Sequence, residues 1–102
     1  MDEWVRNGRF LVEMSIGEAA DELGLDHTQL AFYFRFYEHT EFRIWRKRMR
    51  IEYACRLMKE RPDLPLSSIG EYVGIPDRSN FRREFYEICG MFPSEWKEQN
   101  VR

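Results

Sequence analysis

The chain has 102 residues, of which 43% are hydrophobic and 16% aromatic, so it can build a core and is not a disordered tail. This length predicts one domain, or two very small units that share a core. No apolar stretch approaches the ~20 residues of a membrane span, and the N-terminus, MDEWVRNGRF, is too charged for a signal peptide.

The net charge of −2 hides a gradient along the chain. Residues 26–61 carry 9 basic and 5 acidic side chains, whereas residues 1–25 carry 2 basic and 6 acidic ones. Residues 62–102 carry 5 basic and 7 acidic ones. Because a polyanion responds to the local face of a protein rather than to its net charge, the acidic total does not exclude nucleic acid as a partner.

The spacing of apolar residues predicts seven helices and no strands, an all-α fold. The first predicted helix covers DEWVRNGRFLVEM and places Trp4, Leu11 and Val12 in the core. The second begins after Ser15, which forms a capping box with Glu18. Its apolar stripe consists of Ile16, Ala19, Ala20 and Leu23.

Gly24 ends the second helix, and Asp26 begins the third with Gln29 at the capping-box position. The apolar positions of the third helix follow the spacing i, i+3, i+4, i+7, which predicts a single buried face. That face consists of Leu30, Tyr33, Phe34 and Tyr37.

A long fourth helix is predicted to start at a Thr40 cap and to run to about Glu60, before Pro62 and Pro65. Its predicted core residues are Phe42, Trp45, Met49, Ala54, Leu57 and Met58.

Three shorter helices follow. The fifth runs from about Leu66 to Val73, before Gly74; the sixth begins after Asp77 and ends at Gly90. The seventh begins at Pro93, a residue suited to the first turn of a helix.

The chain contains an internal repeat. SIGE occurs at Ser15–Glu18 and at Ser68–Glu71, but these copies lie at different distances from the turn glycines. A better register pairs Ile16, Leu23, Gly24, Leu30, Phe34 and His39 with Leu66, Val73, Gly74, Phe81, Phe85 and Gly90. Each copy is a short helix, a glycine turn and a second helix, so the repeat predicts two helix-turn-helix units.

The sixth helix divides into an apolar and a basic face. At 100° per residue, Phe81, Phe85 and Ile88 form one stripe. The other side carries Arg78, Ser79, Arg82 and Arg83. A recognition helix in a DNA major groove has this arrangement, and arginine can bond bidentately to guanine. The alternative is a solvated amphipathic helix whose arginines pair with acids such as Glu84 and Glu87.

The outward face of the third helix is less polar: it carries His27, Thr28, Ala31, Phe32 and Arg35. An outward Phe32 could touch thymine methyl groups, wedge at a base step or pack on another chain. It could equally lie against a neighbouring loop.

The fourth helix contains RIWRKRMRI, whose five cations are Arg43, Arg46, Lys47, Arg48 and Arg50. They cannot all point to one side of a helix. Some are expected to reach DNA phosphates, which adds affinity that depends on salt but not on sequence. The others are solvated charges.

Three stretches, SIGEAADELGLDHTQLAFYFR, FRIWRKRMRIEYACRLM and VGIPDRSNFRREFYEICGMFPSEW, resemble the DNA-binding domain of AraC/XylS-family bacterial transcription regulators. The resemblance runs from about Ser15 to Lys97. It implies two helix-turn-helix units joined by a long linker helix, with recognition helices in successive major grooves. Residues 1–61 would form the first unit with the linker, and residues 62–102 the second, in one compact DNA-binding domain.

The resemblance also implies site residues by position. Base contacts would come from Arg78, Ser79, Arg82 and Arg83, and from Thr28, Ala31 and Phe32 with His27 beside them. Contacts to the DNA backbone are assigned to Arg35, Arg43, Lys47 and Asn80.

Three positions depart from the family pattern. His39 stands where a helix-ending glycine is usual, so that turn must accept a left-handed residue other than glycine or relax. Gly70 replaces a packed alanine, at a helix-propensity cost of roughly 0.5–1 kcal/mol. Phe92 stands where a capping Ser or Thr is common before Pro93.

The sequence thus predicts a sequence-specific, double-stranded-DNA-binding domain of a cytoplasmic, nucleoid-associated transcription regulator. RNA polymerase is a further candidate partner, and a sensing or dimerisation domain is expected upstream of this chain. No membrane contact by this domain is expected. The alternative is a protein-interaction module of the same fold with weak or no DNA affinity.

No cofactor, metal site or catalysis is expected, because the chain has no nucleophile–base pair, carboxylate dyad or phosphate-binding glycine loop. Cys55 and Cys89 lack ligand-like spacing and are interpreted as buried thiols of a reducing cytoplasm. A DNA-repair alkyl acceptor with a similar domain would need a reactive cysteine, and neither position favours one. His27 and His39 are not interpreted as a metal-ligand pair.

Overall fold

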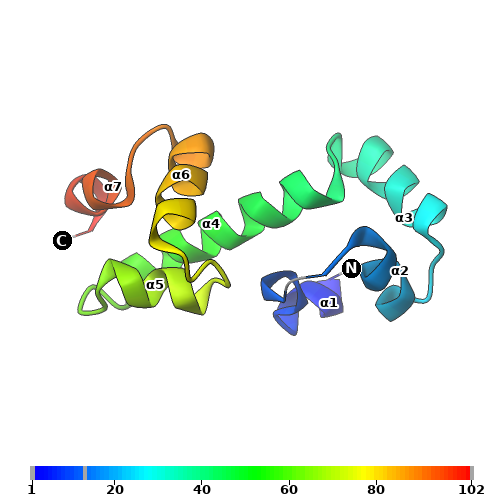
Figure 1. Cartoon of the computed structure of the whole chain (residues 1–102), viewed down its shortest axis with the longest axis horizontal. Helices are drawn as coiled ribbons and strands as arrows, with labels where there is room; N and C mark the ends of the chain where they lie inside the picture. The colour runs from blue at the N-terminus through cyan, green and yellow to red at the C-terminus, as the bar shows by residue number, and fades with distance from the viewer. Residues whose placement is uncertain (1, 13, 102) are drawn as a thin grey trace. The chain divides into compact units, whose positions relative to one another are not determined.

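The computed structural model describes residues 2–12 and 14–101, and this part of the chain is all-α, with seven α-helices and no strand (Figure 1). None of these helices combines the length and the apolar character that a bilayer span requires. The elements are α1 (Asp2–Arg6), η1 (Arg9–Leu11), α2 (Ile16–Leu23), α3 (His27–Tyr33), η2 (Phe34–Glu38), α4 (Phe42–Glu60), α5 (Leu66–Tyr72), α6 (Arg78–Cys89) and α7 (Pro93–Asn100). Of the short segments, η1 is a 3₁₀ turn and η2 is π-helical.

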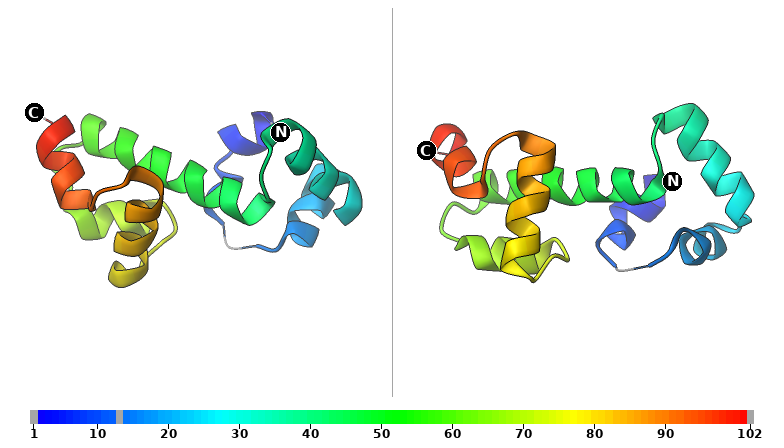
Figure 2. Two further views of the ribbon diagram at one scale, coloured as in Figure 1. Left: turned by 90° about the horizontal axis from the view of Figure 1, so that it is seen from above. Right: turned by 45° about the horizontal axis from the view of Figure 1, so that its top comes forward.

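The chain divides into two compact units, Met1–Lys47 and Arg48–Arg102, and the boundary falls within α4. Unit 1 contains α1, α2, α3 and the start of α4; unit 2 contains the rest of α4 with α5, α6 and α7 (Figure 2). In each unit two helices meet at a glycine turn, α2 with α3 at Gly24 and α5 with α6 at Gly74.

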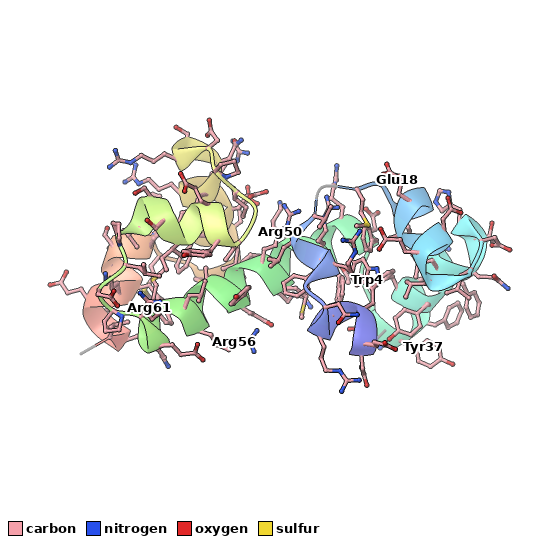
Figure 3. All side chains as sticks on the ribbon, turned by 90° about the horizontal axis from the view of Figure 1, so that it is seen from below. Trp4, Glu18, Tyr37, Arg50, Arg56 and Arg61 are labelled. Atoms are coloured by element: carbon pink, nitrogen blue, oxygen red, sulfur yellow. The ribbon has the colours of Figure 1, made fainter. Side chains whose placement is uncertain are left out.

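An aromatic cluster forms the centre of unit 1. Trp4 of α1, labelled in Figure 3, is 6% exposed, and its ring centroid lies 6.1 Å from those of both Phe42 and Trp45. Phe34 closes the cluster at 5.1 Å from Trp45 and 5.4 Å from Phe42. The cluster therefore joins α1 to the end of the helix-turn-helix and to α4.

The prediction of one continuous first helix is wrong. Helix α1 ends at Arg6, Gly8 adopts a left-handed conformation (φ 72°), and η1 follows. Because Gly8 redirects the backbone, the helical rotation of 100° per residue does not continue from α1 into η1. A helical wheel drawn through Gly8 therefore assigns the later side chains to the wrong faces. Phe10 is buried, whereas Val12, predicted to be core, is exposed and Leu11 only half-buried.

An ion pair ties the N-terminal segment to α2. The Arg9 guanidinium donates two hydrogen bonds to the Glu22 carboxylate, at 2.9 and 2.7 Å, and the Trp4 indole donates a third at 3.1 Å. The Arg9 hydrogen bond is the main cause that lowers the pKa of Glu22 below its ordinary value.

The predicted starts of α2 and α3 are confirmed in atomic detail. Ser15 Oγ accepts the Glu18 amide hydrogen at 3.2 Å, and the Asp26 carboxylate accepts the Gln29 amide hydrogen at 2.8 Å. Both capping boxes are complete, because the Glu18 and Gln29 side chains accept the backbone amide hydrogens of Ser15 and Asp26. Helix α4 begins at Phe42, one residue later than a Thr40 cap predicts.

The predicted buried face of the third helix is only partly right. Leu30 and Phe34 are buried and Tyr33 is half-buried. Tyr37, which is labelled in Figure 3, is instead 71% exposed. The reason is the π-helical segment η2, whose wider turn rotates the residues after Phe34 away from the face that a 3.6-residue wheel gives them.

The core of unit 2 gathers around α6. Phe85 is fully buried and Phe81 is 4% exposed; their rings lie 5.9 Å apart, and Phe85 contacts Trp96 of α7 at 6.2 Å. The other fully buried large side chains of this unit are Ile51, Met58, Ile69 and Val73. Cys55 and Cys89, predicted to be buried thiols, are half-buried.

The repeat register agrees with the backbone geometry. Gly24 and Gly74 have φ of 73° and 79°, and the paired helix ends His39 and Gly90 have φ of 55° and 75°. His39 thus takes the left-handed conformation itself rather than relaxing the turn.

Candidate nucleic-acid interface

The N-terminus of α6 is fixed by local and tertiary contacts. The Asp77 carboxylate accepts the Asn80 amide hydrogen at 2.8 Å, which caps the helix. Phe81 and Phe85 anchor one face in the core, as predicted. The opposite face is therefore held in a fixed orientation toward solvent.

All four base-contact candidates of α6 lie on that exposed face. Arg78, Ser79, Arg82 and Arg83 are exposed, and they line one concave patch together with Tyr86, Glu87 and Phe92. The structure therefore brings the predicted residues together and adds two aromatic rings to them.

The arginines of the patch differ in their partners. Arg83 donates to Asn80 Oδ1 at 2.9 Å and lies 3.9 Å from the Glu87 carboxylate, so the alternative of an internally paired arginine holds for this residue. Arg82 instead places its guanidinium carbon 4.3 Å from the centroid of the Phe92 ring. Asn80, predicted to contact the DNA backbone, is exposed but engaged with Arg83.

In unit 1 the candidates also share a surface. His27, Thr28, Ala31, Phe32 and Arg35 line one shallow concavity on α3 and η2. All are exposed except Ala31, which is half-buried.

Phe32 has a neighbour that the sequence did not predict. It is 55% exposed, and its ring stacks on that of Phe36 with centroids 4.2 Å apart. Phe36 is 58% exposed, so the pair forms an apolar surface beside Arg35. Phe32 is thus exposed over more than half of its surface, and its ring lies against Phe36 of η2.

A matching family model supports this architecture: the helix-turn-helix domain model matches residues 19–99. The chain belongs to the AraC-type helix-turn-helix family of DNA-binding regulators. No curated protein sequence matches the chain closely.

Solved structures show the same AraC-type fold. The C-terminal domain of AraT, a response regulator from Geobacillus stearothermophilus, is 21% identical, with a TM-score of 0.82 over 96% of this chain and 86% of that one. A DNA-binding transcriptional dual regulator from Escherichia coli K-12 is 23% identical, with a TM-score of 0.80 over 93% and 84%. A protein of unknown function from Listeria innocua is 21% identical, with a TM-score of 0.73 over 88% and 85%.

Two arginines in the basic run of α4 are buried in this AraC-type domain. Arg46 is 8% exposed and donates to the carbonyl oxygens of Val12 and Met14 in unit 1. Arg50 is 6% exposed and points to the Gly74 carbonyl in unit 2 at 3.5 Å. These two charges hold backbone within their own units, a role that sequence reasoning missed because both tertiary partners are carbonyl groups distant in the chain.

The remaining candidates of the run are more accessible. Arg43 is exposed and lines a groove of unit 1 with Arg35 and Thr40, whereas Lys47 is half-buried. Arg35 and Arg43, both predicted to contact DNA phosphates, therefore lie on one surface of the unit.

Neither a metal centre nor an activated thiol accompanies this interface in the described residues. Within residues 2–12 and 14–101 no three His, Cys, Asp or Glu side chains gather as metal ligands would. Burial is the main cause that raises the pKa of Cys55 to about 12, and it also raises the pKa of Cys89. A thiol that holds its proton in this way is a poor nucleophile at neutral pH.

Proposed function

We propose that this chain binds double-stranded DNA sequence-specifically, with α6 and α3 as recognition helices in the major groove. The observation that carries the proposal is the division of α6. Phe81 and Phe85 fix the helix in the core, while Arg78, Ser79 and Arg82 share an exposed concave patch. A recognition helix needs a buried anchor and a polar outer face, because its N-terminal residues must meet base edges in a fixed register.

Within this proposal the two units have different roles. The α6 patch offers guanidinium groups, which can bond bidentately to guanine O6 and N7. The α3 face offers mainly Thr28, His27 and the apolar Phe32, with Arg35 and Arg43 beside them for phosphates. The main sequence discrimination is therefore assigned to α6, and much of the salt-dependent affinity to unit 1.

The test is a selection of bound duplexes from a random pool, followed by titration of variants on the selected site. Arg82→Ala should relax the preference at one base-pair position and cost about 1–3 kcal/mol on the preferred base. Arg43→Ala should weaken all sequences alike and reduce the salt dependence. Uniform loss in both variants would show that α6 does not read bases.

A second candidate function is protein interaction without DNA affinity. The exposed stack of Phe32 and Phe36 favours it, because an apolar pair of this kind also suits a protein partner. A titration with random duplex DNA at low and moderate salt distinguishes the two functions. Absence of binding at low salt would favour the interaction module.

The proposed activity belongs to the bacterial cytoplasm, on the chromosome, with RNA polymerase as a candidate further partner. It requires binding alone and no catalytic step.

A further inference from the structure

Phe92 places an aromatic ring under a predicted base-reading arginine. The Arg82 guanidinium carbon lies 4.3 Å from the centroid of this ring, well within the range of a cation–π contact. The same ring packs on Tyr86 of α6, with centroids 4.8 Å apart. One residue of the α6–α7 loop thus contacts two exposed side chains of the recognition helix.

The backbone under this ring is well fixed. Phe92 directly precedes α7, and the next residue, Pro93, is buried in the first turn. The Phe92 amide donates to the Glu95 carboxylate at 3.2 Å. The ring therefore belongs to a held position rather than to a free loop.

Helix capping does not explain a phenylalanine at this position. Phe92 is the N-cap residue of α7, where side chains that accept a hydrogen bond are preferred. A phenyl ring cannot accept the amide hydrogens of the first turn. A residue that breaks a local preference indicates another role for its side chain.

The contact leaves the reading groups of Arg82 available. A ring stacked on a guanidinium covers the face of the plane, whereas bidentate hydrogen bonds use the N–H groups at its edge. Among the described residues, Arg82 makes no hydrogen bond or ion pair, whereas Arg83 is engaged with Asn80 and Glu87. Arg82 is thus ordered by a contact that does not compete with a base.

We propose that Phe92 is a positioning residue for DNA recognition: its ring holds the Arg82 guanidinium on the α6 patch before DNA arrives. Ordering a long side chain in advance reduces the conformational entropy lost on binding, so discrimination at the base pair that Arg82 meets depends on Phe92. The inference rests on the proposed DNA-binding function. It adds a specificity determinant that makes no base contact of its own.

The first test needs no DNA. In the NMR spectrum of the 102-residue chain, the Arg82 Nε–H signal should show a ring-current shift and restricted motion. Both should be lost in Phe92→Leu and retained in Phe92→Tyr. Phe92→Ser removes the ring but supplies an N-cap acceptor, so it provides a second ring-less variant should the leucine variant fold poorly. Unchanged Arg82 signals in the ring-less variants would overturn the inference whatever the chain binds.

The second test measures base preference with a random duplex pool. Phe92→Leu should reduce discrimination at the Arg82 position by about two- to fivefold, the fold-change that corresponds to an exposed cation–π contact. Preference at the other positions should remain, and Phe92→Tyr should restore the native profile. Tyr72→Leu, at an exposed aromatic residue of α5 in the same unit, is the control and should change nothing.

The outcomes separate the two proposals. A wild-type chain that selects no duplex would refute the proposed function, and the role of Phe92 in recognition would be refuted with it. If the wild-type chain selects duplexes and the ring-less variants show the same base preferences as the wild type, only the inference about Phe92 is refuted.

Discussion

Cys55 of α4 and Cys89 of α6 bring their sulfur atoms to 3.9 Å from each other. Both thiols are half-buried, and desolvation is the main cause that raises the pKa of each. The neighbouring Cys89 raises the pKa of Cys55 further. The pair is therefore a contact of two protonated thiols between α4 and α6.

We expect both thiols to react slowly with iodoacetamide at pH 7.5 in the native chain and quickly in urea. The pKa of Cys55 is about 12 in the folded chain against about 8.5 in an unfolded one. Stability from the protonated thiol is thus fully present below pH about 8.5 and is lost as the pH rises toward 12, because the unfolded chain ionises first.

Urea midpoints measured between pH 8 and pH 11 test this expectation. The double variant Cys55→Ala, Cys89→Ala should show a shallower decline with pH than the native chain. Rapid alkylation of the native chain at neutral pH would contradict the raised pKa and would restore a nucleophilic role as a hypothesis.

Phe85→Ala should destabilise unit 2 by about 3–5 kcal/mol, because it removes a fully buried aromatic side chain. That loss is a large part of the ~5–15 kcal/mol available to a small domain. Phe36→Ala is the control, since this phenylalanine is 58% exposed and should cost far less. Equal urea midpoints for the two variants would show that α6 packs by another face.

Gly70→Ala should destabilise the chain, although alanine is the better helix former. A Cβ atom at Gly70 would lie 2.9 Å from the Ile75 carbonyl oxygen, so the α5–α6 turn would have to shift. Gly17→Ala is the matched control: its Cβ would have ordinary contact at 3.7 Å, and it should stabilise by up to about 1 kcal/mol. Thermal melting of both variants measures the difference, and a more stable Gly70→Ala would contradict the close approach.

Phe32→Ala should change the free energy of unfolding by no more than about 1.5 kcal/mol, because it removes only a stacked pair on the surface. We expect it to reduce duplex affinity, most strongly at sites with T or a flexible step opposite it. Stability and affinity must be measured on the same protein. Early melting with unaltered binding by the folded fraction would refute a contact role, and normal binding with normal stability would favour a protein partner.

Glu22→Gln should loosen α1 from α2 at neutral pH, because it removes the charged acceptor of Arg9 and weakens that of Trp4. In the native chain the same contact should hold above pH about 4.3 and be lost as the pH falls through the lowered pKa of Glu22. The NMR signal of the Trp4 indole N–H reports both changes. A signal that is insensitive to the variant and to pH would show that the aromatic cluster alone holds α1.

Features that depend on neighbours in sequence could be predicted. The capping boxes of Ser15 and Asp26 and the end at Gly24 follow from residues three or fewer positions apart, and each is present. The repeat register predicted that His39 is equivalent to Gly90, and both adopt the left-handed conformation.

Features that depend on a change of helical pitch could not be predicted from a wheel of constant period. Tyr37 is exposed because η2 inserts a wider turn, and Phe10 replaces Val12 in the core because Gly8 breaks the first helix. The periodicity of apolar residues indicates neither the left-handed conformation of Gly8 nor the π-helical turn of η2.

At the α6 patch, too, some features could be predicted from the sequence and others could not. The exposed face of Arg78, Ser79, Arg82 and Arg83 follows from the spacing of two buried phenylalanines. The ring of Phe92 under Arg82 is a tertiary contact across ten positions, and no periodic pattern indicates it. The stack of Phe32 on Phe36 could have been found from their i, i+4 spacing.

The burial of Arg46 and Arg50 also changes how a salt titration of DNA binding would have to be interpreted. The slope of log K against log salt counts the protein cations that displace condensed counterions from the duplex. Each phosphate contact adds about 0.9 to the magnitude of this slope. RIWRKRMRI offers five cations, but the guanidinium groups of these two are directed at carbonyl oxygens of the protein. The run can therefore contribute no more than about 2.7 to that slope, and a steeper dependence would have to come from cations outside it.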